Sequence, residues 1–434
     1  MRNFYYFIIL LIALVFIFGI DFDYARELTI NNEPNDVTVK SSLPQFSMAH
    51  KIQEGIESLK ISAPLGYENK AVKQRNGRLT VTNELSRKQI ALAILDYKTG
   101  EIFEHRVWTS ENEIKNYKKT GILNLEPVDS NSSLVVEVEW WNSFNSVYRV
   151  GPSDLRASDS KRLAVIANKF LFPSAYLSGL PERSTQQYAD IIYAPYSKPL
   201  HLPELIEAGN DYLEKNINQA LAELDTDKVR SLAVSGTLVT SGITKDFIKN
   251  IVLVEHIDPD AFSVATDGGQ ELAERVLVVI GANQNSAYRY TGSPAGASGL
   301  AQFIKPTYDL MAAKYPKARL IKNYNAGMVN HVNAIKAMVL FFDSHRKEIS
   351  DKVTDRGIVR SLGITEEMLA AAYNGGPSRV VKSVNNFGRG WLSKQVNSSN
   401  AVRIFRPETI SYIKKFQAIK NLNLFANISG SLEN

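Results

Sequence analysis

The stretch Gly-Ala-Ser-Gly-Leu-Ala-Gln-Phe-Ile, residues 296–304, is the most informative part of this 434-residue chain. Its two glycines allow main chain to approach a ligand without a clash from a Cβ atom. Pro306 and Thr307 follow almost at once, and proline suits the first turn of a helix. We therefore expect a glycine-rich segment that brings backbone next to a ligand and leads directly into a helix.

Two further short motifs follow this stretch. Ala-Ala-Tyr-Asn-Gly-Gly occupies residues 371–376, and Pro-Glu-Thr-Ile-Ser-Tyr occupies residues 407–412. Asn and Gly in the first of these are residues that commonly end a helix. Glu408 in the second is suited to a helix start, where the helix dipole favours a negative charge. Both motifs thus have a structural interpretation as well as a functional one.

The three motifs together resemble the G-A-x-G-L-M-Q-I, A-Y-N-A-G and E-T-R-x-Y motifs of the soluble lytic transglycosylase family, in the same order. The resemblance covers about residues 240–420. It implies a goose-lysozyme-like helical fold and cleavage of the MurNAc–GlcNAc strand of peptidoglycan to 1,6-anhydro-MurNAc, without an attacking water, a metal or another cofactor. The substrate-binding residues that it implies are Ser298, Gly299, Leu300, Gln302, Tyr373, Asn374 and Tyr412.

The resemblance fails at the position of the family's catalytic glutamate. That residue ends a buried helix, and the first glycine of the G-A-x-G motif comes twelve positions later; counting back from Gly296 leads to Gln284. The apolar residues 276–280 predict the buried helix, at about 271–283. Glutamine has no proton to give at neutral pH. A site with only Gln284 would hold glycan and cut it slowly or not at all.

Three explanations of Gln284 compete: a natural pseudo-enzyme that binds glycan, a sequence altered from Glu to Gln, and an acid that has moved elsewhere. Glu255 is the leading candidate for a moved acid, because it ends the apolar run 251–254 just before the Asp258–Pro259 stop. Its ordinary interpretation is a charge at a helix end that faces water or pairs with a Lys or Arg. His331, which has no carboxylate pattern beside it, is expected to be structural.

The composition is that of an ordinary globular protein, with 44% hydrophobic and 22% charged residues. The absence of cysteine excludes disulfides, thiolate catalysis and cysteine-ligated metal. A net charge of +5 suits an anionic cell wall, but no dense stripe of Lys and Arg indicates nucleic-acid binding.

The N-terminus predicts export. Residues 4–20 form an uninterrupted apolar run behind Arg2, and Asp21 and Asp23 follow it. This order is typical of a segment that enters a membrane with its N-terminus inside. No clean cleavage site of small residues follows, so an uncleaved anchor is favoured over a removed signal peptide. Either alternative places the remaining chain in the cell envelope, on the periplasmic side, in contact with peptidoglycan.

The fold class predicted from these patterns is α+β, with a β-rich accessory domain before an all-α lysozyme-like domain. Hairpins are expected at 90–108, around Lys98–Gly100, and at 134–150, where Trp140 and Trp141 point to opposite faces so that at least one is core. The expected boundaries are 1–25 for the signal or anchor, 26–79 for an irregular tether, 80–155 for the β-rich domain, 156–240 for a helical connecting region and 241–425 for the lysozyme-like domain.

Helical periodicity predicts a long amphipathic helix at 202–224 and further helices at 245–256, 271–283, 306–314, 328–343, 366–373 and 407–420. The functional expectation is a lytic-transglycosylase-like protein acting on peptidoglycan strands. Two alternatives stay open. One is a catalytically dead binding or scaffold module, and the other is a hydrolase like goose-type lysozyme.

Overall fold

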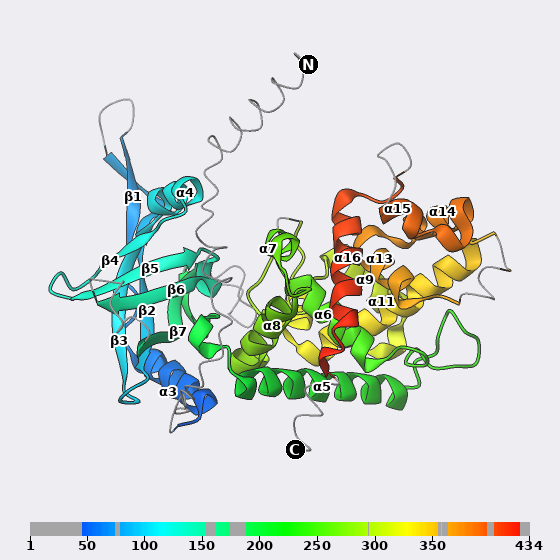
Figure 1. Cartoon of the computed structure of the whole chain (residues 1–434), viewed down its shortest axis with the longest axis horizontal. Helices are drawn as coiled ribbons and strands as arrows, with labels where there is room; N and C mark the ends of the chain where they lie inside the picture. Colours follow the sequence, from blue (N-terminus) through cyan, green and yellow to red (C-terminus); the bar gives the residue numbers. More distant parts are fainter. Residues whose placement is uncertain are drawn as a thin grey trace, which may run out of the picture. The chain divides into compact units, whose positions relative to one another are not determined.

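The computed structural model describes residues 46–73, 79–152, 162–173, 188–293, 295–354, 357, 363–396 and 403–425. These residues belong to one compact unit that begins at Phe46, and they form an antiparallel sheet followed by a series of helices (Figure 1). The predicted α+β class is confirmed. The apolar run at 4–20 lies outside the described residues, and none of the helices within them is both long and apolar enough to cross a membrane.

The sheet has the strand order β6-β5-β4-β3-β2-β7-β8, and β1 pairs with the first part of the long strand β2. Every pairing is antiparallel. Both predicted hairpins are confirmed, as β2–β3 and β5–β6. The strands are β1 (Tyr67–Lys73), β2 (Leu79–Asp96), β3 (Ile102–Ser110), β4 (Asn124–Pro127), β5 (Leu134–Trp140), β6 (Val147–Pro152), β7 (Leu163–Pro173) and β8 (Tyr188–Tyr193).

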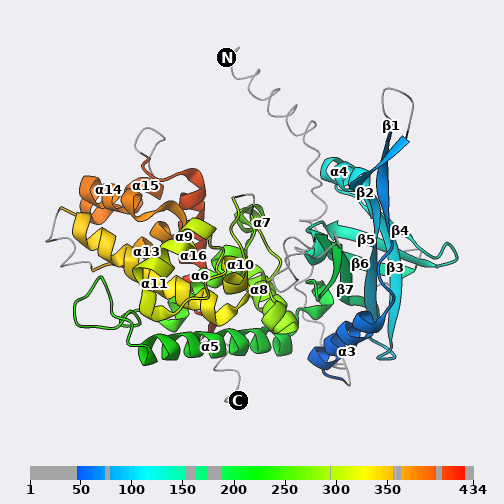
Figure 2. The same ribbon diagram turned by 180° about the vertical axis from the view of Figure 1, so that it is seen from behind.

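The sheet extends into the region where a helical connection was expected. β7 lies between β2 and the edge strand β8 and is buried along nearly its whole length, so its sequence lacks the alternation that identifies a half-exposed strand. A helix, α3 (Met48–Ile61), also lies in the region expected to be irregular. Ser47 caps it by accepting a hydrogen bond from the His50 amide, and α3 packs on β2 and β7 (Figure 2).

The helical part follows the predicted periodicity closely. Helices lie at all the predicted positions, although the helix expected from 328 begins at His331 and runs on to Lys352. The helices are α5 (Pro203–Thr226), α6 (Lys245–His256), α7 (Pro259–Val264), α8 (Gln270–Asn283), α9 (Lys305–Lys314), α10 (Tyr324–Val329), α11 (His331–Lys352), α13 (Glu366–Gly375), α14 (Pro377–Phe387), α15 (Ser393–Val396) and α16 (Pro407–Asn421), with α4 (Glu111–Thr120) between β3 and β4.

Helices α5 and α8 approach each other so closely that two glycines are required. A Cβ atom added at Gly209 would lie 2.0 Å from the Leu277 carbonyl oxygen, and one at Gly281 would lie 2.3 Å from the Leu205 carbonyl oxygen. Real Cβ atoms do not come so near to backbone, so each glycine lets one helix backbone rest on the other. Because α8 also forms part of the wall of the cavity described below, this contact helps to set the width of the site.

The contact predicts that Gly209→Ala destabilises the protein. Alanine favours a helix over glycine by about 1 kcal/mol, but separating two packed backbones costs about 2–3 kcal/mol, so we expect a net loss of about 1–2 kcal/mol in the free energy of unfolding. Urea unfolding followed by circular dichroism measures it. Asn218→Ala, at an exposed position of the same helix, serves as control and should be neutral or slightly stabilising. Equal stability of the two variants would contradict the close contact.

Candidate active site

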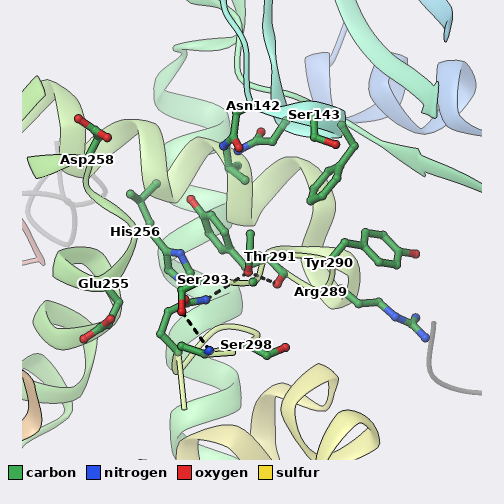
Figure 3. Close-up of a pocket in the computed structure, with 18 of the residues that line it drawn as sticks. Asn142, Ser143, Glu255, His256, Asp258, Arg289, Tyr290, Thr291, Ser293 and Ser298 are labelled. Carbon is green, nitrogen blue, oxygen red and sulfur yellow. Dashed lines mark hydrogen bonds between the residues drawn. The ribbon is translucent and has the colours of Figure 1, made fainter. Parts of the chain in front are cut away.

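A cavity of about 1110 Å³ lies where the connection between β5 and β6 meets the helical part. Its wall comes from that connection, from the end of α6, from α7 and one side of α8, and from the segment that leads into the 296–304 stretch. Figure 3 shows Asn142 and Ser143 of the β5–β6 connection on one side of the space and Glu255 and Asp258 on another. The site therefore draws residues from both halves of the described fold.

Glu255 is in the last turn of α6 and lines this cavity. The helix is buried along most of its length, which holds the half-buried carboxyl group at the edge of the apolar core. Burial raises the pKa of the Glu255 carboxyl to about 7, and two contacts limit the rise. The Tyr412 hydroxyl donates a hydrogen bond to Oε1 at 2.7 Å, and the nearby Lys415 ammonium attracts the carboxylate. A substantial fraction of Glu255 thus carries its proton at neutral pH.

Lys415 holds the end of α6 in place. Its buried ammonium donates hydrogen bonds to the carbonyl oxygens of Val254, at 2.9 Å, and Ile257, at 2.7 Å. The last carbonyls of a helix have no partner within the helix and carry partial negative charge, so a cation there is favourable. Lys415 and Tyr412 both come from α16, and together they fix the backbone and the side chain of Glu255.

His256 joins the end of α6 to the glycine-rich stretch. Its ring stacks on Tyr288 with centroids 3.6 Å apart, and Nε2 lies 3.0 Å from the Leu300 carbonyl oxygen. Burial lowers the pKa of His256 to about 3, so the ring is neutral at physiological pH. Because a carbonyl can only accept, Nε2 carries the single proton and Nδ1 is left as an acceptor. No motif in the sequence points to His256 as a site residue.

The 296–304 stretch contributes to the site in two ways. Ser298 and Gln302 line the cavity, and Gln302 Nε2 donates to the Gly299 carbonyl oxygen at 2.7 Å. Gly299 has a φ of +69°, and a Cβ atom there would lie 2.4 Å from the Met328 carbonyl oxygen. Its role here is close packing against α10. Leu300 is buried and is not part of the cavity wall. Its carbonyl oxygen accepts a hydrogen bond from His256.

The other implied substrate residues take different positions. The Tyr373 hydroxyl donates to the Ala301 carbonyl oxygen at 2.5 Å, and this residue supports the stretch from behind rather than lining the cavity. Asn374 is exposed and accepts a hydrogen bond from Thr409 at 2.9 Å. Tyr412 is buried and reaches the site through Glu255. The structure thus brings Ser298, Gln302 and Glu255 to one cavity.

Gln284 is placed apart from this set. It is the exposed residue at the end of α8, with a φ of 45°, and it does not contribute to the cavity wall. The predicted helix before it is confirmed, but its cavity-lining residues lie further up the helix, at Leu272, Arg275, Val276 and Val279. Of the two candidate acid positions, Glu255 alone lies on the wall of the cavity.

Only a weak sequence signal, the Trp140–Trp141 pair, points to the sheet's part in the site. Trp140 is 41% exposed and lines the cavity, whereas Trp141 is half-buried and packs against Phe170 at the edge of the core. His331 is buried between the Tyr212 hydroxyl and the Ala287 carbonyl and has a structural role. Among the described residues, no three His, Asp or Glu side chains come together in a way that could hold a metal ion.

The contacts from α16 predict how the pKa of Glu255 responds to mutation. Tyr412→Phe removes a hydrogen bond that favours the carboxylate, and Lys415→Met removes a nearby positive charge, so both should raise this pKa above about 7. A ¹³C NMR titration of the carboxyl group, assigned with Glu255→Gln, measures it. Lys414→Met removes an exposed charge one residue away and should leave the titration unchanged. A pKa near 4.5 in the unaltered protein would refute the buried-acid environment.

Comparisons with known proteins assign no family to this geometry. No protein-family model matches the chain. No curated protein and no solved structure matches it at a significant level. The likeness of the three motifs to those of lytic transglycosylases therefore remains a resemblance carried by the residues, and the functional conclusion has to be drawn from the chemistry of the cavity.

Proposed function

We propose that this protein is a lytic-transglycosylase-like enzyme that cleaves the glycan strand of peptidoglycan, with Glu255 as its general acid and base. The observation that carries the proposal is a carboxyl group with a pKa of about 7 on the wall of a large cavity, held by Tyr412 and Lys415. A carboxyl group that keeps its proton near neutral pH is what cleavage of a glycosidic bond requires. The proposed acid is therefore Glu255 and not the residue at position 284, to which the motif spacing leads.

The proposed reaction uses this one carboxyl group twice. Protonated Glu255 gives its proton to the glycosidic oxygen while the bond from that oxygen to C1 of MurNAc breaks. The carboxylate then takes the proton of the MurNAc 6-hydroxyl as the 6-oxygen bonds to C1, which closes the 1,6-anhydro ring. Glu255 ends the cycle protonated again, and no water is consumed. A pKa near 7 suits both steps, because neither protonation state is strongly disfavoured.

The surroundings of Glu255 also suit a glycan. The cavity is lined by aromatic rings, among them Trp140 and Tyr290, and by hydroxyl and amide side chains such as Asn142, Ser298 and Gln302. Aromatic faces cover the apolar faces of sugar rings, while the amides and hydroxyls can bond to the sugar hydroxyls and acetamido groups. The proposal includes an envelope location on the periplasmic side, based on the apolar run at 4–20.

A hydrolase like goose-type lysozyme is the second candidate, because Asp258 lines the same cavity. Inverting glycosidases use a second carboxylate to activate water. Asp258, however, serves as the N-cap of α7, and its Oδ1 accepts from the Ala261 amide at 2.8 Å. This structural bond favours the non-hydrolytic reaction. A binding module without catalysis remains the alternative in which Glu255 is only a buried acid.

Glu255→Gln should reduce the cleavage rate by about 10²–10⁴-fold, the usual contribution of general acid–base catalysis. Digestion of purified murein sacculi, with mass spectrometry of the released muropeptides, measures the rate. Gln284→Glu is the matched control, and it should leave the rate unchanged because position 284 is exposed and outside the cavity. Activity gained only in Gln284→Glu would instead place the acid at 284 and support the dead-enzyme alternative.

Product analysis in H₂¹⁸O separates the two reactions. The proposed reaction yields 1,6-anhydro ends without incorporated ¹⁸O, whereas hydrolysis yields reducing ends that carry one ¹⁸O atom. Asp258→Asn keeps a side-chain oxygen able to cap α7 and should retain most of the activity if Asp258 is only a cap. Loss of activity in this variant, together with ¹⁸O-labelled products, would favour the hydrolase.

A further inference from the structure

The charges around the cavity are divided between two sides. Glu255 and Asp258 lie on one side, and Arg289 lies on the opposite side beside Tyr290 (Figure 3). Arg275, on α8, lines the cavity as well. A neutral polysaccharide needs no such division, because its hydroxyl and acetamido groups carry no charge. The two arginines therefore call for a separate explanation.

Of the two arginines, Arg289 has the positive charge that neighbouring groups neutralise less. It is half-buried, and its guanidinium lies 5.8 Å from the centre of the Tyr290 ring. Among the described residues, no carboxylate lies within salt-bridge distance of its guanidinium. Its positive charge contributes to the low pKa of His331, after the larger effect of burial. Arg289 is thus a half-buried residue of the cavity wall whose positive charge no carboxylate of the described residues neutralises.

Arg275 is held more firmly and is partly neutralised. Its guanidinium lies over the Tyr196 ring at 4.3 Å, a cation–π contact that fixes its direction. The neighbouring Glu274 is engaged elsewhere, since its carboxylate bonds to His201 Nε2 at 2.8 Å and to Gln270 at 2.8 Å. Glu271 and Glu274 still lie near the same tyrosine. Arg275 should therefore attract an anion less strongly than Arg289.

We propose that Arg289 and Arg275 bind free carboxylates of the peptide stem attached to MurNAc, so that the cleft selects peptide-bearing glycan. This inference rests on the proposed function. Arginine binds carboxylates through paired hydrogen bonds, and its partners are favoured most where water is partly excluded. Asn142, Ser143 and Asn145 of the β5–β6 connection line the same cavity and offer donors and acceptors for the amides of a peptide.

The wall supplied by the sheet thereby gains a role. A cleft for glycan alone could be built entirely from the helices that carry Glu255 and the glycine-rich stretch. The β5–β6 connection adds amide and hydroxyl groups to the wall of the cleft. These groups suit a branched ligand, in which the glycan follows the acidic side and the peptide leaves toward Arg289.

Calorimetric binding in a Glu255→Gln background, where turnover is blocked, tests the inference. The probes are GlcNAc-MurNAc-tetrapeptide with free carboxylates, the same muropeptide with those carboxylates amidated, GlcNAc-MurNAc with its lactyl carboxylate but no peptide, and chitotetraose. We expect the free form to bind about tenfold more tightly than the amidated form. Arg289→Gln should remove that difference, Arg275→Gln should reduce it, and Arg289→Lys should keep part of it. Arg403→Gln, at an exposed position outside the cavity, should change nothing.

Each outcome has a separate meaning. Equal binding of the free and amidated muropeptides would overturn the arginine site while leaving glycan binding in place. A preference for peptide-free GlcNAc-MurNAc over the tetrapeptide would assign the arginines to the lactyl carboxylate and would also overturn the peptide site. Failure to bind any of the four saccharides, by variants whose thermal unfolding matches that of the unaltered chain, would overturn the proposed function itself.

Discussion

The structure depends on a pair of hydrogen bonds between one buried amide side chain and the backbone after the sheet. Asn283 Nδ2 donates to the Ala194 carbonyl oxygen, and the Ala194 amide donates back to Asn283 Oδ1, each at 2.8 Å. Asn283 ends α8, and Ala194 directly follows β8. Because α8 also rests on α5 through glycine contacts, this pair fixes the helical wall of the cavity against the sheet. A two-sided cleft follows from that join.

Much of the fold was predictable from local pattern. Amphipathic helices carry a period of 3.6 and β5 a period of 2 in their sequences, and the turn at Lys98–Gly100 marks the β2–β3 hairpin; those elements lie where these signals indicate them. β7 could not be found in this way, because it is covered on both faces and its apolar residues do not alternate. Its position between β2 and β8 is a property of the assembled sheet. Tertiary burial, rather than local propensity, decides that segment.

The site was predictable in its residue types but not in its assembly. Counting twelve positions back from Gly296 leads to Gln284. This count assumes that the acid lies at a fixed distance along the sequence from the glycine-rich stretch. Helices α7 and α8 lie between the end of α6 and the glycine-rich stretch. Contacts bring the two together across that interval, with His256 bonded to Leu300 and Tyr412 bonded to Glu255. Such contacts between distant residues leave no spacing signal in a single sequence.

Because α16 supports Glu255, the site is completed only late in the synthesis of the chain. Tyr412 and Lys415 belong to α16, the last helix among the described residues. They leave the ribosome more than 150 residues after Glu255. Until that helix docks, the carbonyls at the end of α6 lack their lysine, and the carboxyl group lacks its hydrogen bond from Tyr412. A chain cut short before α16 would carry every residue of the glycine-rich stretch and still lack the tuned acid.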